Sequence, residues 1–172
     1  MNASSSRLET RCSPVQFLKT VLLTSSLLIA ASACATKPGT PPAFAPWYPS
    51  NNQVGDPIFG VFEGRVPCGD CEVIKLGLAL YWNPDAQSPT TYQMSRVHVG
   101  KGNDRTVNEG SWVITSGTSL DPQAVVYQLD SLSPPEFRSF LAIGDHILLV
   151  LDDAMNPRVG NAAWSYALSR TN

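Results

Sequence analysis

The sequence predicts an all-β protein, a small antiparallel barrel or half-barrel of seven to eight strands. Apolar and polar residues alternate from residue 58 onward, with the period of two that half-buried strands show. Turn-forming residues interrupt the alternation at short intervals, as in an antiparallel meander. No stretch of this region has the apolar period of a helix of three turns. A barrel would leave no open edge strand, and a two-sheet sandwich is the alternative.

The clearest predicted strand is Glu72–Trp82, in which every second residue from Ile74 to Trp82 is a large apolar one. Seven further strands are expected, at Ile58–Val66, Thr90–Val99, Thr106–Ile114, Ala124–Asp130, Phe137–Ile143, His146–Asp152 and Ala163–Arg170. Segments rich in Gly, Pro, Asn, Asp and Ser separate them. Gly144-Asp145 fits a two-residue hairpin turn, because glycine supplies the positive φ that strand twist favours.

Residues 1–33 are expected to be a lipoprotein signal peptide. Three basic residues precede an uncharged apolar run that ends at Ala33. The run is too short to span a bilayer and has the length of a secretory h-region. Small residues lead directly to Cys34, as in the lipobox of bacterial lipoprotein precursors, and an A-x-A cleavage would expose the same cysteine. We therefore expect Cys34 to carry a lipid anchor, which can hold a protein at a membrane without a spanning helix.

Residues 34–57 are expected to be a lipidated, flexible tether. Their many prolines favour extended polyproline-like conformations. Trp47 and Tyr48 interrupt this composition, and we expect them to dock on the domain, with the lipid headgroup zone as the other location. No aspartate follows Cys34 directly, which favours the outer membrane, with the domain facing the periplasm.

Residues 58–172 have the length of one domain with a single core. The net charge of the chain is −2, and the basic residues are scattered along the sequence rather than clustered. No helix-turn-helix, zinc-finger or aromatic-basic motif is visible, so nucleic acid is not an expected partner, and nothing resembles a phosphate-binding surface. No G-x-S-x-G motif or glycine-rich phosphate loop occurs either. We expect that the protein is not an enzyme.

Cys68 and Cys71 form a C-x-x-C pair directly after the first predicted strand. In an oxidising compartment two cysteines at this spacing most often form a short-loop disulfide. A disulfide ring this small stabilises a fold by only about 2 kcal/mol, so its effect is local. A thioredoxin-type catalyst would place the first cysteine at a helix N-terminus, whereas the residues from Glu72 onward predict a strand. Catalytic thiol exchange is therefore not expected, but redox sensing is.

Metal binding is the second interpretation of the same pair. Structural zinc normally requires four protein ligands, and residues 34–172 offer one C-x-x-C pair and two histidines. Copper(I) accepts fewer and softer ligands, so reduced Cys68 and Cys71 could bind it with Met94, His98 or Met155. No cofactor is otherwise required. The acidic pair Asp152-Asp153 is expected to cap a turn or to lie solvated at a strand end.

The segment G-V-F-E-G-R-V-P-C-G-D-C, residues 60–71, with Leu76-x-Leu78-x-Leu80 after it, resembles the amino-terminal domain of the NlpE family. Glu109-Gly110-Ser111-Trp112 and Leu148–Asp152 continue the resemblance, which covers nearly all of residues 58–155. It implies a lipocalin-like barrel and a bacterial lipoprotein linked to copper resistance and envelope stress. The carboxy-terminal domain of the enterobacterial member has no counterpart here, and Asn83–Thr90 looks longer than the tight turn usual in the family.

The sequence thus predicts an envelope lipoprotein whose barrel presents Cys68 and Cys71 for copper homeostasis or for sensing envelope or redox stress. The expected partners are the membrane, an envelope stress-sensor protein and the thiol oxidation machinery. Two alternatives stay open. One is a lipocalin-like carrier of a small apolar ligand with a purely structural disulfide, and the other is an accessory of outer-membrane assembly.

Overall fold

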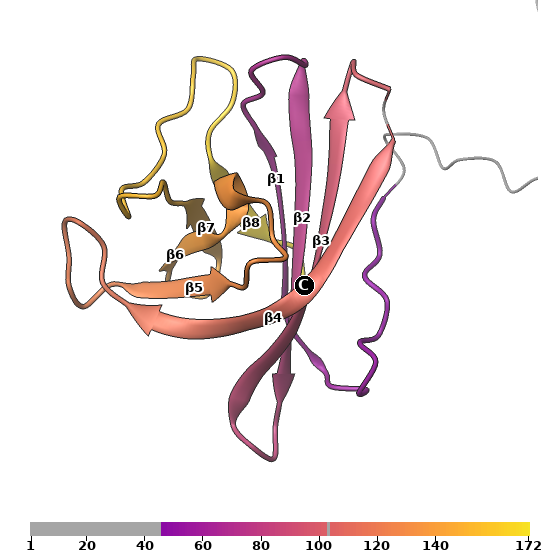
Figure 1. Cartoon of the computed structure of the whole chain (residues 1–172), viewed down its shortest axis with the longest axis vertical. Coiled ribbons are helices and arrows are strands. Elements are labelled where there is room, and N and C mark those ends of the chain that lie inside the picture. The colour runs from indigo at the N-terminus through magenta and orange to yellow at the C-terminus, as the bar shows by residue number, and fades with distance from the viewer. Residues whose placement is uncertain (1–45, 103) are drawn as a thin grey trace, which may run out of the picture. The chain divides into compact units, whose positions relative to one another are not determined.

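The computed structural model describes residues 46–102 and 104–172, and within them the chain forms a closed antiparallel barrel (Figure 1). Its strands are β1 (Ile58–Val66), β2 (Val73–Asn83), β3 (Ser88–Val99), β4 (Arg105–Ser116), β5 (Val125–Leu129), β6 (Ser139–Ile143), β7 (Ile147–Val150) and β8 (Ala167–Arg170). A 3-10 helix, η1 (Pro135–Phe137), precedes β6. The predicted all-β barrel is confirmed, and neither the half-barrel nor the sandwich is adopted.

The described residues belong to one compact unit. The predicted signal peptide and the predicted lipid anchor, Cys34, lie outside the described residues. Within the described part of the chain, no helix combines the length and the apolar character needed to cross a membrane.

All eight predicted strands exist, but several end elsewhere. Asn83 pairs with Ser88, so β2 and β3 are joined by a four-residue turn at 84–87 and not by the longer loop expected at Asn83–Thr90. Gln87 closes this turn with a φ of 51°. β8 is four residues long instead of eight, because the chain before Ala167 forms a loop. Gly144 has the expected positive φ, 55°, in the turn between β6 and β7.

The barrel closes where β1 meets β8 through two register pairs, Phe62 with Arg170 and Glu63 with Ser169. The last residues of the chain extend this contact, since Thr171 N donates to Val61 O at 2.8 Å. Gly64 is required for the approach, because a Cβ at this position would overlap the backbone carbonyl of Ala167. The second glycine of the G-V-F-E-G segment therefore allows β1 and β8 to approach closely enough to close the barrel.

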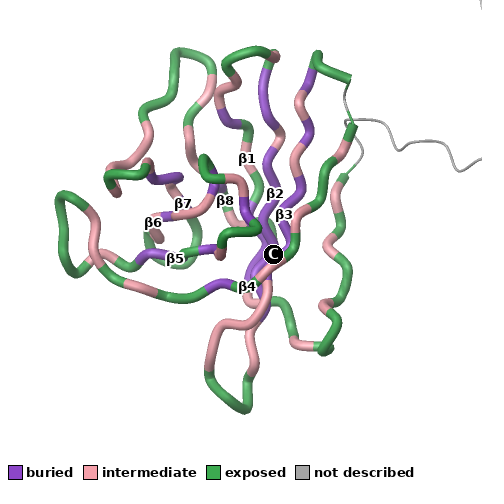
Figure 2. The backbone as a smooth tube through the Cα atoms, in the orientation of Figure 1, coloured by how far each residue is buried: buried purple, intermediate pink, exposed green. Residues whose placement is uncertain are grey.

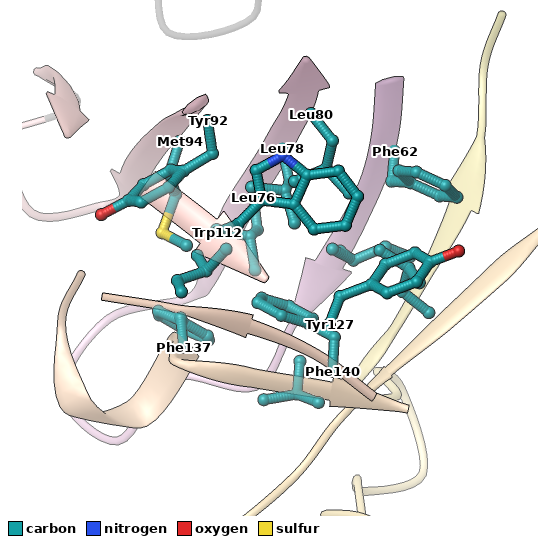
Figure 3. Close-up of a cluster of buried hydrophobic side chains, with 14 of the residues drawn as sticks. Phe62, Leu76, Leu78, Leu80, Tyr92, Met94, Trp112, Tyr127, Phe137 and Phe140 are labelled. Atoms are coloured by element: carbon teal, nitrogen blue, oxygen red, sulfur yellow. The ribbon is translucent and has the colours of Figure 1, made fainter. Parts of the chain in front are cut away.

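Large apolar side chains fill the interior of the barrel (Figure 3). They come from every strand and from η1, and most are less than 3% exposed. Figure 2 shows long buried stretches along β2 and β3. The labelled members are Phe62, Leu76, Leu78, Leu80, Tyr92, Met94, Trp112, Tyr127, Phe137 and Phe140. Trp112 also donates its indole N–H to Tyr81 O at 2.9 Å. Burying each such side chain contributes about 1.5–3 kcal/mol, so the interior is the main source of stability.

The segment 46–57 packs along the outer face of β1–β3. Trp47 lies over Gly77, where a Cβ would overlap its ring, and it packs against Val61, Ala79 and Tyr81. Ser50 N donates to Gln93 Oε1 at 3.0 Å. The expected docking is thus confirmed for Trp47. Tyr48, by contrast, is 82% exposed.

Gly64→Ala should destabilise the domain by about 2 kcal/mol, because the new methyl group must displace the backbone of β8. Chemical denaturation followed by circular dichroism measures this change. Gly69→Ala is the matched control. No atom lies within 4 Å of its added Cβ, so a loss of about 0.5 kcal/mol or less is expected there. Equal losses in the two variants would contradict the role given to Gly64.

Candidate functional site

The candidate site is the connection between β1 and β2, residues 67–72, at the upper end of the barrel in Figure 1. Cys68 and Cys71 form a disulfide there, with their Cα atoms 5.3 Å apart. Both are half-buried and pack against the interior cluster, while Gly69 and Asp70 between them are exposed. The predicted disulfide at the end of a barrel is confirmed.

The neighbouring turn between β3 and β4 holds this connection in place. Glu72 N donates to Val99 O at 3.0 Å, and Lys101 N donates to His98 O at 3.1 Å. The ammonium group of Lys101 forms an ion pair with the carboxylate of Asp70, although 31 residues separate the two. The disulfide end therefore depends on two turns that the sheet places side by side.

Lys101 also sets the electrostatics of Asp70. The hydrogen bond and the charge of Lys101 lower the pKa of the Asp70 carboxyl below its usual value, and His98 adds a smaller effect in the same direction. Asp70 Oδ1 lies 3.5 Å from Cys68 Sγ. A carboxylate that stays ionised this close to the sulfur disfavours a thiolate at Cys68.

The surroundings of the cysteines differ from those of a thiol catalyst. β2 begins two residues after Cys71, and among the described residues no helix N-terminus faces either sulfur. The described residues around the disulfide supply an acidic side chain at Asp70 and no histidine bonded to a sulfur. The geometry holds a disulfide and does not activate a nucleophile.

The structure brings only part of the predicted copper site together. Cys68, Asp70 and Cys71 place one ligand atom each within 4.8 Å of the others. Met94 is buried in the barrel interior, and Met155 lies in the turn after β7, where its carbonyl accepts from Ser119 N. His98 is near enough to influence Asp70 but does not belong to the group of ligand atoms. While the disulfide is intact, the two sulfurs are not available as thiolates, so only the reduced pair fits copper(I).

Two carboxylates away from the disulfide stabilise the fold by accepting hydrogen bonds from backbone N–H groups. Asp152 Oδ1 accepts from Ala154 N and Asn156 N, both at 2.9 Å, which confirms the expected turn cap. Sequence reasoning missed Asp130, which accepts from Ser111 N at 2.7 Å and lies where a Cβ on Gly110 would be. The Glu109-Gly110-Ser111-Trp112 motif is explained by this contact, because glycine leaves room for the carboxylate that serine binds.

The model of the family described as NlpE N-terminal domain matches residues 62–161, more than half of the chain. The chain belongs to the NlpE N-terminal domain family. The match runs from β1 to the segment after β7 and includes both cysteines of the disulfide. No curated protein matches the chain significantly.

Two solved structures are similar to this member of the NlpE family. A protein from Shewanella oneidensis, described as a "putative lipoprotein", is 24% identical, with a TM-score of 0.43 over 66% of this chain and 88% of that one. The Cpx pathway activator NlpE from Escherichia coli is 22% identical, with a TM-score of 0.41 over 62% of this chain. This chain covers 48% of the Escherichia coli chain, or about half its length.

Replacing Lys101 with Met should raise the pKa of Asp70 towards that of a free aspartate, because the hydrogen bond and the charge that lower it are removed. The stabilisation from this pair is present at neutral pH and is lost as the pH falls through the lowered pKa. NMR titration of the Asp70 side-chain carboxyl measures the shift. Lys101→Arg keeps the charge and should keep the pKa low; an unchanged pKa in Lys101→Met would contradict the pairing.

Proposed function

We propose that the protein is a lipid-anchored component of the bacterial cell envelope whose barrel presents the Cys68–Cys71 pair as a sensor of thiol oxidation or copper. The observation that carries this proposal is the position of the disulfide. It lies at one end of a barrel that is closed and filled without it, so its state can change while the fold persists. Membership of the NlpE family supports the envelope location.

The anchoring part of the proposal rests on the sequence. Cys34 follows a signal-like segment, and a lipid on it would hold the domain at the outer membrane, facing the periplasm. The solved structures similar to this chain are described as a lipoprotein and as an activator of the Cpx pathway. An envelope stress-sensor protein and the thiol oxidation machinery are the partners that this role requires.

The chemistry at the site is a two-electron change. Oxidation joins the sulfurs of Cys68 and Cys71 and releases two protons and two electrons to a thiol-oxidising partner. In the reduced state, the two thiolates would supply the soft ligands that copper(I) prefers. Copper and oxidation therefore compete for the same sulfurs. The remainder of the site contains no group for bond-making chemistry, and the protein is proposed not to be an enzyme.

A carrier function is less well supported. A lipocalin-like carrier needs a cavity inside its barrel, whereas side chains such as Trp112, Phe62 and Phe140 occupy the interior here. The hollows described below lie outside the barrel. Assistance in outer-membrane assembly requires a partner surface, and no observation at the disulfide end favours it over sensing.

The double variant Cys68→Ser/Cys71→Ser should change copper tolerance or an envelope-stress reporter while the barrel stays folded. We expect a loss of about 2 kcal/mol of stability and loss of copper(I) binding by the reduced protein. Competition with a chromogenic chelator measures the binding. His146→Gln, on an exposed turn, is the control and should bind as the parent does. An unchanged phenotype at normal abundance would refute sensing, and unchanged copper affinity would refute the metal site.

A further inference from the structure

A row of basic residues crosses the outer face of the sheet. Arg65 on β1 pairs with Lys75 on β2, Lys75 pairs with Val97 on β3, and Val97 pairs with Arg105 on β4. Directly paired residues of an antiparallel sheet point to the same side, so three cations occupy one line across four strands, within about 15 Å. The register of these four strands thus brings together basic residues that lie far apart in the sequence. We call Arg65, Lys75 and Arg105 the basic row.

Two hollows flank the basic row. The larger, about 530 Å³, is lined by all three cations together with Trp47, Gly77 and Ser95. The smaller, about 380 Å³, is lined by Arg65 and Lys75 together with Trp164, which packs over Val73, Val97 and Val99. The basic row therefore lies between two half-buried indole rings, one from the segment before β1 and one from the loop before β8.

The side chains of the basic row are held by their surroundings. The guanidinium of Arg65 lies 5.7 Å from the ring centroid of Trp164, and Arg105 donates to Ser95 Oγ at 2.7 Å. Lys75 lies between them and is half-buried. Like charges directly opposite each other in a sheet are destabilising. Burial lowers the pKa of Lys75, the charges of Arg65 and Arg105 lower it further, and Glu63 acts in the opposite direction. The cations of the basic row therefore repel one another, and Glu63 offsets part of this repulsion at Lys75.

The acidic neighbours limit what can bind. Glu63 lines the larger hollow and Glu72 lines the smaller one. A long polyanion that followed the sheet would meet both carboxylates, whereas a compact anion over the row in the larger hollow meets three cations and the single carboxylate of Glu63. Two guanidinium forks and one ammonium suit a phosphate group, whose terminal oxygens accept several charge-assisted hydrogen bonds. The indole rings provide apolar surface for the remainder of the same ligand.

We propose that the basic row binds the phosphate group of a ligand that also carries an apolar part, either an anionic phospholipid or a soluble phosphate ester. This site adjoins the disulfide connection at Glu72, which lines the smaller hollow, but its existence does not depend on the proposed sensing function. Its position does suit a lipid source, because Pro46 of the segment that leads back to Cys34 lines the larger hollow.

The test uses the chain from residue 34 onward with Cys34→Ser, labelled with nitrogen-15 and titrated with inorganic phosphate. Saturable NMR shifts are expected for the amides of the basic row and for the indole N–H groups of Trp47 and Trp164. The indoles of Trp82 and Trp112 contact the interior cluster and should not move. Lys75→Gln should weaken binding about tenfold, the effect of losing one charge-assisted partner. Arg158→Gln, which also removes one positive charge and lies outside both hollows, should not alter it.

A second arm distinguishes the sources of the phosphate. Flotation with phosphatidylglycerol vesicles, lost in Lys75→Gln and not seen with phosphatidylcholine, would assign the site to an anionic lipid. Binding of inorganic phosphate without a preference for phosphatidylglycerol would assign it to a soluble phosphate ester. Shifts that sodium chloride reproduces at equal ionic strength, or equal weakening by Lys75→Gln and Arg158→Gln, would overturn the proposal.

Discussion

Closure of the sheet between β1 and β8 is the contact on which the rest of the structure depends. Only two register pairs join these strands, and Gly64 must lack a side chain for them to form. The carboxy-terminal residues add hydrogen bonds, among them the one from Val61 N to Asn172 Oδ1 at 2.7 Å. Once the sheet is closed, the inward side chains of all eight strands share one interior, and their burial outweighs the conformational entropy lost on folding. An open sheet would expose the same side chains along two edges.

A closed and filled barrel leaves its ends and its outer face for function. The disulfide end consists of two turns joined by the Asp70–Lys101 ion pair, and its half-buried cysteines lie at the border of the interior cluster. The outer face of β1–β4 carries Trp47 over Gly77, together with the basic row. We propose a different role for each place, redox sensing at the cysteines and anion binding at the basic row, and Glu72 is the residue at which the two adjoin.

The sequence allowed the strands to be predicted because burial alternates along them, most clearly from Ile74 to Trp82. The strand ends were less predictable. The turn at 84–87 needs a positive φ at Gln87, which its residue type does not indicate, and the alternation at 163–166 belongs to a loop whose Trp164 covers the outer face. The C-x-x-C spacing identified the disulfide, whereas the role of Lys101 depends on a contact across 31 residues. The basic row follows from the register of four strands, which no local pattern encodes.

The central claim is that the Cys68–Cys71 disulfide is a local element whose state changes while the barrel persists. Comparison of nitrogen-15 NMR spectra of the oxidised and reduced protein tests it most directly. Shift changes should be confined to residues 67–72 and to the adjoining turn at 99–104, with the signals of β4–β8 unmoved. Loss of signal dispersion throughout the barrel on reduction would contradict the claim, because it would make the disulfide a condition for folding.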